Sequence, residues 1–413
     1  MGLIRMQIEK YIEQFTTLWL ESSTQIPPLG SIYSYKEKVS RESQLEEFLQ
    51  KVKKVQGERT KLELNNSSYA KAIFPAIRTL LKSAFNFEDK HLDIILSEGY
   101  IEATKKFIKT GHRFDPNLSI EDIFQACRNV WIINGIQSMM GLPVELTPSI
   151  FAYSMLYPYT DNYLDNPHTT SESKIIFSRH FQQRIEGKEI VPENTEEKII
   201  FDLIGMIEDQ YERSCYPKIY ESLLAIHKGQ TKSISLLDPS SSLSEKEVLK
   251  ICIEKGGASV LADGYLVSGS LTESQERFLF GFGAYLQLVD DIQDVNEDSK
   301  AGLLTPFSQA LGQISLDEFT NRTFNFGIKV MDHINCFKGI NLDSLKSLME
   351  KSIKILLIES VGFNDKFYNR SYTQEIDEYS PFRFSYLKKR RNSLSTNHGL
   401  FLKEIEEFIL TSD

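Results

Sequence analysis

Apolar residues recur along this chain at helical rather than alternating spacing. The segments between Gly- and Pro-containing breakers are long, and most repeat apolar residues at intervals of three and four positions, which is the period of an amphipathic helix. Capping signals stand at Ser244-Glu-Lys-Glu247, Thr272-Glu-Ser-Gln275 and Ser315-Leu-Asp-Glu318, so helices are predicted to begin there. The first should run through Val267 and the second to about Val295.

Two further helices are predicted to begin at prolines. Thr147-Pro148 and Thr305-Pro306 place proline at a first helical position, where its missing N–H costs nothing. We expect about a dozen helices of roughly 15 to 30 residues in all. The sequence has only 22 Gly and 13 Pro among 413 residues, which argues against a turn-rich all-β fold. The predicted fold is therefore all-α, with a single main domain at 61–413 and peripheral helices at 1–60.

Composition narrows the class of protein. The chain has 47 basic and 57 acidic residues, a net charge of −10, which argues against diffuse binding to nucleic acid. The four cysteines, Cys127, Cys215, Cys252 and Cys336, are far apart, so reduced thiols in a cytoplasmic protein are expected. No apolar run approaches the ~20 residues that cross a bilayer, and no signal peptide is recognisable. We expect a cytoplasmic protein without a membrane span.

Two segments each carry aspartates four residues apart. The first is Tyr157-Pro-Tyr-Thr-Asp161-Asn-Tyr-Leu-Asp165, and the second is Gly283-Ala-Tyr-Leu-Gln287-Leu-Val-Asp290-Asp291-Ile-Gln-Asp294. On a helix this spacing puts both carboxylates on one face, roughly 5–6 Å apart. Such like charges repel unless a cation lies between them. Mg²⁺ is typically held by one or two carboxylates together with substrate phosphate.

Acidic pairs at this spacing also arise by chance, roughly eight times in a chain of this composition. What distinguishes these two is that each continues a less polar helix face. Gly283, Leu286 and Gln287 precede Asp290 on one face, and Tyr153 and Tyr157 precede Asp161 on another. A solvated acidic face does not normally extend an apolar one. The predicted metal ligands are Asp161, Asp165, Asp290 and Asp294, with Asp291 and Asp298 as weaker candidates.

These segments resemble the class I isoprenoid synthases, all-α enzymes that include prenyltransferases and terpene cyclases. Glu254-Lys255-Gly-Gly-Ala-Ser259 followed by Gly283-x-x-x-Gln287-x-x-Asp290-Asp291-x-x-Asp294 is similar to a series in prenyl elongases. Gln230, in His227-Lys-Gly-Gln230, matches their upstream Gly-Gln step. The likeness is confined to residues 150–310. It implies a helical bundle around a deep apolar cavity, with Mg²⁺ as cofactor and an isoprenyl diphosphate as substrate.

Two departures from the elongase pattern favour a cyclase. Asn162 replaces the second Asp of the first motif, and Asn166-Pro-His-Thr-Thr170 stands where elongases carry arginines. The N-terminal Gly-Lys-Arg element that binds the homoallylic co-substrate is also missing. The resemblance is therefore closest to bacterial class IB (large-terpene-synthase-like) cyclases. It implies ionisation of an allylic diphosphate, C20 or C15 being favoured, followed by cyclisation and release of pyrophosphate.

Other residues are candidates for binding the substrate. Lys255 offers a point charge to a diphosphate oxygen, and Gly256-Gly257 after it indicates close approach of another group. Tyr153 and Tyr157 share the Asp161 face, where aromatic rings stabilise a carbocation. The remaining candidates are Gln230, Gln287, Arg179, Arg184, Arg213 and Lys388, the last in the basic run Lys388-Lys-Arg-Arg391. For the basic residues, surface ion pairs are the competing interpretation.

Two rival functions stay open. One is prenyl transfer, by chain elongation or by head-to-head joining of two allylic diphosphates. The other is a non-catalytic helical protein whose aspartate pairs are remnants or a Ca²⁺ site. A homodimer is an expectation for the assembly, and neither the substrate chain length nor the product skeleton follows from the sequence.

Overall fold

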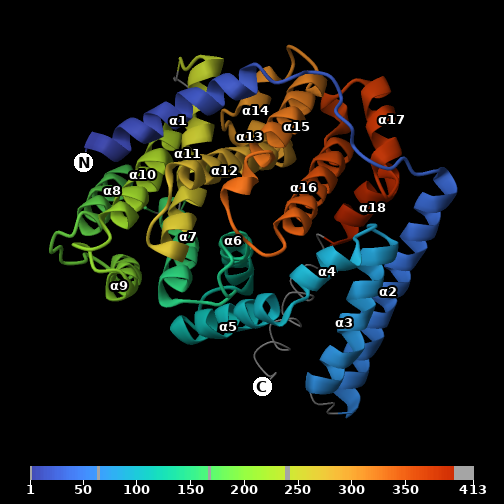
Figure 1. Cartoon of the computed structure of the whole chain (residues 1–413), viewed down its shortest axis with the longest axis horizontal. Coiled ribbons are helices and arrows are strands. Elements are labelled where there is room, and N and C mark those ends of the chain that lie inside the picture. The colour runs from blue at the N-terminus through green and yellow to red at the C-terminus, as the bar shows by residue number, and fades with distance from the viewer. Residues whose placement is uncertain (1, 63–65, 166–168, 238–241, 395–413) are drawn as a thin grey trace. The chain divides into compact units, whose positions relative to one another are not determined.

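A computed structural model describes residues 2–62, 66–165, 169–237 and 242–394. Over these ranges every regular element is a helix and none is a strand, so the predicted all-α fold class is confirmed (Figure 1). The longer helices run from 15 residues in α8 (Ser171–Ile185) to 28 in α2 (Tyr35–Leu62). No described helix combines the length and the apolar character needed to cross a membrane.

The chain divides into two compact units. The first comprises residues 1–25 and 125–342, and the second comprises 26–124 and 343–413. The first unit holds α1 (Gly2–Leu20), most of α6 (Ile120–Met140), α7 (Pro148–Asp165), α8, α9 (Thr195–Gln210), α10 (Pro217–Ser233), η1 (Ile234–Leu237), α11 (Glu245–Ser268), α12 (Glu273–Gln293), α13 (Val295–Ala301), α14 (Pro306–Ala310), α15 (Asp317–Met331) and η2 (Ile334–Cys336). The second holds α2, α3 (Asn66–Ser83), α4 (Asp89–Ile95), α5 (Glu98–Phe114), α16 (Leu342–Phe363), η3 (Asp365–Phe367), α17 (Arg370–Tyr379) and α18 (Phe384–Leu394).

The helix starts agree with the capping signals in most cases. Ser244 and Thr272 close capping boxes with Glu247 and Gln275, and α11 and α12 begin directly after them. Pro148 and Pro306 are the first residues of α7 and α14. The third signal marks a real helix start, but its capping differs: Leu316 is the N-cap residue of α15, and no side-chain cap bond forms there.

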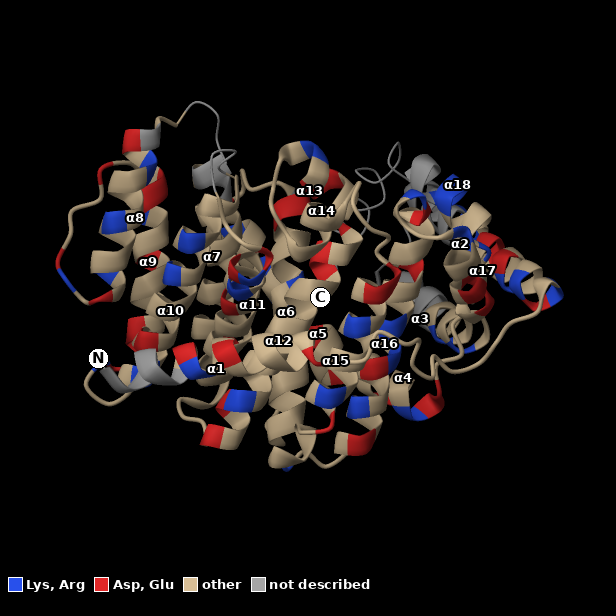
Figure 2. Cartoon of the chain, turned by 90° about the horizontal axis from the view of Figure 1, so that it is seen from above, with Lys and Arg blue, Asp and Glu red and all other residues tan. Residues whose placement is uncertain are grey.

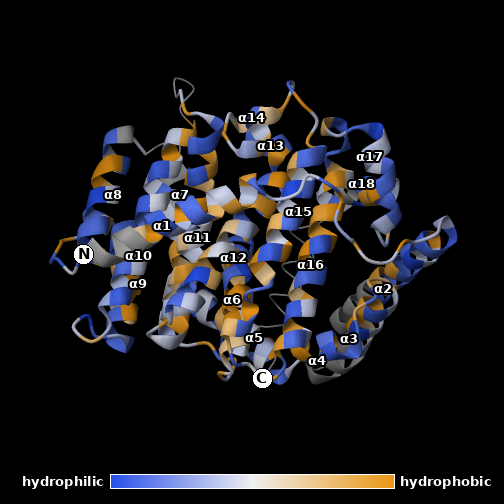
Figure 3. Ribbon diagram, turned by 45° about the horizontal axis from the view of Figure 1, so that its top comes forward, coloured by the Kyte–Doolittle hydropathy of each residue, from blue (hydrophilic) through white to orange (hydrophobic). Residues whose placement is uncertain are grey.

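Apolar stripes on the helices of the first unit form its core (Figure 3). Helix α11 packs against α10 and α12, and α12 also packs against α15. Phe278, Phe280, Phe324 and Phe326 are fully or almost fully buried there. These helices form a rigid scaffold on which polar groups at one end can be positioned.

Helix α1 belongs to this core. Tyr11, Phe15 and Trp19 are at most 3% exposed. The Tyr11 hydroxyl donates to Glu276 Oε2 (3.3 Å), and Trp19 Nε1 donates to Thr323 Oγ1 (3.1 Å). This packing argues against a peripheral position for residues 2–20, while the division into domains at residue 60 stays a prediction.

In the second unit, α2 is joined to the C-terminal helices by buried charges. Lys38 is 3% exposed, and its ammonium group pairs with Asp377 Oδ2 at 2.8 Å. Arg383 and Glu42 form a bidentate pair, with Nε to Oε1 at 2.9 Å and Nη2 to Oε2 at 2.5 Å. These contacts tie segments more than 330 residues apart in sequence.

Candidate active site

The direction of α7 relative to α11 follows from three hydrogen bonds. Near the start of α7, the Ser149 hydroxyl donates to the carbonyl of Leu266, close to the end of α11 (3.5 Å). Further along α7, the hydroxyls of Tyr153 and Tyr157 both reach Ser259 of α11. The two helices are therefore antiparallel, and the last turn of α7 lies toward the N-terminal half of α11.

Helices α11 and α12 are also antiparallel, and glycines let their backbones touch. A Cβ added to Gly256 would lie 2.5 Å from the carbonyl oxygen of Gly283, and one added to Gly264 would lie 2.3 Å from Leu279 Cδ1. Gly264, late in α11, thus meets Leu279, and Gly256, earlier in α11, meets Gly283, which comes later in α12. The last turn of α12, which carries Asp290, therefore lies beside Lys255.

Both aspartate segments are consequently at the same end of the first unit. Asp161 and Asp165 are in the last turns of α7, although their side chains lie outside the described residues. Asp290 and Asp291 are in the last turn of α12. The C-terminal end of a helix carries partial negative charge, and α7 and α12 both end at this end of the unit.

The glycine pair after Lys255 is explained by the neighbouring helix. We expected Gly256 and Gly257 to admit close approach of another group. That group is α12: Gly256 meets the Gly283 backbone, and a Cβ on Gly257 would lie 2.6 Å from the Phe280 ring. The Gly and Gln of the second motif therefore serve helix packing, because Gln287 Cβ would also lie 2.5 Å from a Cβ on Gly256.

The structure corrects which aspartate of the second motif faces inward. Sequence analysis placed Asp290 on the face continued from Gln287, but Asp291 is the buried residue, at 5% exposure, and Asp290 is exposed. The stripe that α12 turns toward α11 is Gly283, Gln287 and Asp291. Gln287 Nε2 donates to Asp291 Oδ1 at 2.8 Å, so Gln287 positions this carboxyl group.

The carboxyl groups at this end have raised pKa values. Burial raises the pKa of Asp291 to about 7, and the charges of Asp290 and Asp298 add to the effect. Desolvation, together with Asp294 and Asp290, raises the pKa of Asp298 to about 7. Desolvation by the surrounding protein also raises the pKa of Asp290, and the charges of Lys255 and Arg128 oppose this shift. Crowded carboxyl groups of this kind are typical of functional sites.

Asp294 marks the break between α12 and α13. It is the C-cap residue of α12 and the N-cap residue of α13. Its N–H donates to the Asp290 carbonyl (2.9 Å), and its own carbonyl accepts from the N–H of Asp298 (2.8 Å). Asp290, Asp294 and Asp298 thus follow one another along a nearly continuous helical path, and the acidic residues of α13 are visible in Figure 2.

The donor set fits Mg²⁺ in its chemistry. Carboxylate oxygens are the ligands that Mg²⁺ prefers, and the ion usually keeps several waters while substrate phosphate completes its shell. It therefore does not require three protein ligands packed together. Among the described side chains, the aspartates at this end do not form so compact a group, whereas His180, Glu193 and Glu197 do.

Two cations lie near these carboxylates. The charge of Lys255 lowers the pKa of Asp290, Asp291 and Asp298, which places its ammonium group among them. Arg128 of α6 acts on Asp290 in the same direction and is exposed. Sequence analysis missed Arg128 because it belongs to no motif, and only the packing of α6 brings it to this end.

Tyr153, Tyr157 and Gln230 line a small apolar pocket below the last turn of α7. The pocket has a volume of about 20 Å³, room for about one water molecule. Leu156, Phe181 and Ile204 continue its wall. Binding of substrate by Tyr153, Tyr157 and Gln230 stays a prediction, and an isoprenoid chain would fit in this pocket only after these side chains move.

Most of the other basic candidates lie in ion pairs. Arg184 forms a bidentate pair with Glu208, both contacts at 2.5 Å, and Arg213 pairs with the same carboxylate. Lys388 belongs to the second unit and pairs with Asp365. Arg179 is exposed on α8. Arg184, Arg213 and Lys388 thus form ion pairs, and binding of substrate by Arg179 and Lys388 stays a prediction.

A buried carboxyl group that the sequence did not single out is on the same stripe of α11 as Lys255 and Ser259. Asp263 is fully buried, and its Oδ1 accepts from Asn129 Nδ2 at 3.1 Å. Desolvation holds its pKa well above the usual range. Asn129 also donates to Ser154 Oγ (3.2 Å), so this group links α6, α7 and α11.

Comparison with known proteins finds only distant similarity. No family model matches the chain, and no curated protein matches it. A geranyltransferase from Legionella pneumophila is 14% identical with a TM-score of 0.40, over 66% of this chain and 99% of its own. A decaprenyl diphosphate synthase from Rhodobacter capsulatus is 13% identical with a TM-score of 0.32, over 73% and 98%. A geranylgeranyl pyrophosphate synthase is 13% identical with a TM-score of 0.29, over 73% and 95%. These similarities do not assign the chain to a family.

Proposed function

We propose that the chain is a Mg²⁺-dependent enzyme that ionises an allylic isoprenyl diphosphate. The observation that supports this proposal is that the last turns of α7 and α12 lie at the same end of the first unit, that of α12 near Lys255. Both segments carry aspartates four residues apart, a spacing that suits a metal-bridged diphosphate, and each helix has its negative pole at that end.

The residues at this end have separate roles. Asp290 and Asp294, with Asp161 and Asp165 of α7, would hold the metal ions, and Asp298 would contribute from α13. When bound, the metal supplies Lewis-acid stabilisation of the leaving diphosphate. Lys255 and Arg128 bind diphosphate oxygens, and Asp291, positioned by Gln287, stays a weaker candidate for the metal. Tyr153 and Tyr157 present aromatic surface to the hydrocarbon and help to exclude water.

Cyclisation of the ionised isoprenoid substrate is our first candidate for the reaction that follows ionisation. The first aspartate segment lacks the second Asp and the arginines of prenyl elongases, and no element for a homoallylic co-substrate is recognisable. An enzyme with one diphosphate site ionises a single substrate, and intramolecular attack then closes a ring. The same proposal includes metal binding by Asp161 and Asp165 and a C20 or C15 substrate.

Prenyl transfer is the second candidate. The second motif, Gly283 to Asp294, follows the elongase pattern without a gap, and the three solved structures named above are a geranyltransferase and two isoprenyl diphosphate synthases. Arg128 supplies at least one of the cations that the first motif lacks. The third possibility, a helical protein without catalytic activity, predicts no release of pyrophosphate at all.

One experiment separates the three. Purified protein with Mg²⁺ is incubated with C10, C15, C20 and C25 allylic diphosphates, each with and without isopentenyl diphosphate, and products are analysed by gas chromatography after phosphatase treatment. Cyclic hydrocarbons or alcohols that form without the co-substrate support cyclisation. A lengthened chain that needs the co-substrate establishes prenyl transfer instead. Intact substrate in every tube would overturn the proposal.

A further inference from the structure

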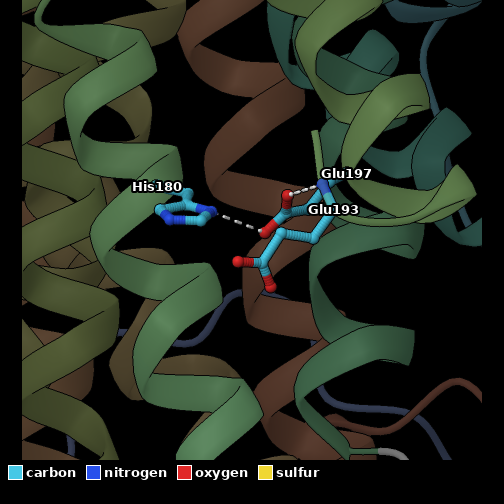
Figure 4. A group of neighbouring side chains, drawn as sticks. All are labelled: His180, Glu193 and Glu197. Atoms are coloured by element: carbon cyan, nitrogen blue, oxygen red, sulfur yellow. Dashed lines mark hydrogen bonds and ion pairs between the residues drawn. The ribbon is translucent and has the colours of Figure 1, made fainter. Parts of the chain in front are cut away.

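Three side chains of metal-ligating types converge where α8 and α9 meet, near Tyr163 of α7. His180 comes from α8, Glu193 from the loop that follows α8, and Glu197 from the first turn of α9. Figure 4 shows the three pointing toward one another. Their nitrogen and oxygen ligand atoms all lie within 4.8 Å of one another. The group therefore combines an imidazole and two carboxylates from separate elements.

The buried member of the group is Glu197, whose side chain is 1% exposed. Its Oε2 accepts the backbone N–H of Glu193 at 2.7 Å, and its Oε1 faces His180 Nδ1 at 3.3 Å. The hydrogen bond from the Glu193 N–H is an ordinary interaction at a helix start, and it accounts for the position of Oε2. The second oxygen is directed at the histidine and toward the carboxylate of Glu193.

No lysine or arginine in the described parts of the chain forms an ion pair with Glu193 or Glu197. The nearest lysines in sequence are paired elsewhere, Lys188 with Glu186 and Lys198 with Asp202, both at 2.7 Å. The N-terminal end of α9 supplies roughly +0.5 of a charge, whereas the two carboxylates together carry about −2 when ionised. Among the described residues, the one basic partner of Glu197 is His180, at 3.3 Å. With a neutral imidazole, the form that binds a metal, roughly −1.5 of charge remains for a divalent cation to balance.

The ligand types indicate which cation. A nitrogen donor beside two carboxylate oxygens suits a borderline metal such as Zn²⁺, which binds His nitrogen at ~2.0–2.1 Å and carboxylate oxygen at ~2.0–2.2 Å. Around such an ion, tetrahedral ligand atoms are ~3.4 Å apart. The group needs to close by little more than 1 Å on this estimate. Glu193 is exposed and in a loop, so it can make that movement.

We propose that His180, Glu193 and Glu197 form a second metal site, one that takes Zn²⁺ or a similar borderline divalent cation. The ion ties the loop between α8 and α9 to both helices. Asn194, between the two glutamates, accepts the N–H of Glu197 at 2.8 Å, so the site also fixes the start of α9. This role is structural and does not depend on the proposed isoprenoid chemistry.

Titration with Co²⁺ or Zn²⁺ in the presence of excess Mg²⁺ tests the proposal on the whole chain. Mg²⁺ occupies oxygen-only sites, and Co²⁺ reports a nitrogen ligand through its visible absorption. The wild-type protein should bind one Zn²⁺ per chain with a Kd in the micromolar range or below, and its Tm should rise. H180Q should abolish this binding, and E193Q should weaken it at least 10-fold.

Matched variants keep the result interpretable. Glu193 is exposed, so E193Q leaves the packing unchanged, and Glu196, an exposed neighbour outside the group, provides the control variant E196Q. E196Q should bind Zn²⁺ like the wild type. The absence of Zn²⁺ binding by the wild type, or equal binding by the wild type, H180Q and E193Q, would overturn the proposal.

Discussion

Lys255 and Arg128 bring positive charge to the same carboxylate, Asp290, from two different helices. In the free protein these two positive charges lower the electrostatic free energy of the carboxylates at the end of α12. Next to a diphosphate they would bind its oxygens as point charges. The polar end of the first unit therefore has both components that a metal-bridged diphosphate needs, acids for the metal and bases for the phosphate.

Neutralising either base should weaken diphosphate binding. We expect K255Q and R128Q each to raise the KM for the allylic diphosphate about 10-fold, which corresponds to ~1.4 kcal/mol. Steady-state kinetics by pyrophosphate release measures this. K250Q is the control, because Lys250 pairs with Glu13 on the surface. An unchanged KM in both variants would remove these residues from the site.

Asp263 should make the protein less stable as pH rises. Its pKa in the folded state is raised, so the folded protein holds a proton that the unfolded chain releases above pH ~4. The free energy of unfolding therefore falls as pH rises from about 4 toward the folded pKa. D263N keeps an acceptor for Asn129 and removes the ionisation.

Melting temperatures in buffers from pH 4.5 to 8 check this expectation. D263N should gain stability over the wild type at pH 7–8, and the difference should shrink toward pH 4.5. D202N, at an exposed residue paired with Lys198, is the control and should show no such trend. A D263N variant less stable than the wild type at pH 8 would show that the buried carboxylate is needed in its charged form.

At the scale of elements, the crossing of α11 and α12 decides where the aspartates stand. Gly256 and Gly283 bring the two backbones into contact, and this fixes the end of α12 beside Lys255. The close crossing also turns Asp291 inward and leaves Asp290 open. The geometry of the site is therefore set by helix packing two turns away from it.

A methyl group at this crossing should be destabilising. G256A and G283A each place a Cβ against backbone oxygen, at 2.5 and 2.2 Å, where no side chain can move aside. We expect each to lower the free energy of unfolding by about 1–3 kcal/mol, and to lower pyrophosphate release as well. Denaturant titration and activity assays measure both effects.

G135A is the matched control, because Gly135 is inside α6 and a Cβ there meets nothing within 4 Å. It should be neutral or stabilising by up to about 1 kcal/mol. If G256A and G283A were as stable as G135A, the close crossing of α11 and α12 would be wrong.

Local signals in the sequence predict the helix starts correctly. The starts of α11 and α12 follow from capping boxes that involve neighbouring residues only, and α7 and α14 begin at their prolines. The face of α12 that meets α11 was not predictable, because it depends on which helix packs there. For the same reason the sequence does not show which group approaches Gly256, or that Arg128 lies near Asp290.

At the scale of the whole molecule, the predicted all-α class is confirmed, and the chain consists of two compact units. The residues of the candidate site belong to the first unit. Four of the 57 acidic residues, Asp290, Asp291, Asp294 and Asp298, lie together at one helix end there. Desolvation raises the pKa of Asp290, Asp291 and Asp298, and neighbouring carboxylates add to the effect at Asp291 and Asp298.

Release of pyrophosphate from C15 and C20 allylic diphosphates, followed with and without Mg²⁺, tests the central claim most directly. The wild type should be active with Mg²⁺ and inactive after chelation by EDTA, and D290N and D161N should each lose at least 100-fold in rate. E297Q, at an exposed acid on α13, should retain wild-type activity. Pyrophosphate release that persists without metal, or at full rate in D290N and D161N, would contradict the account.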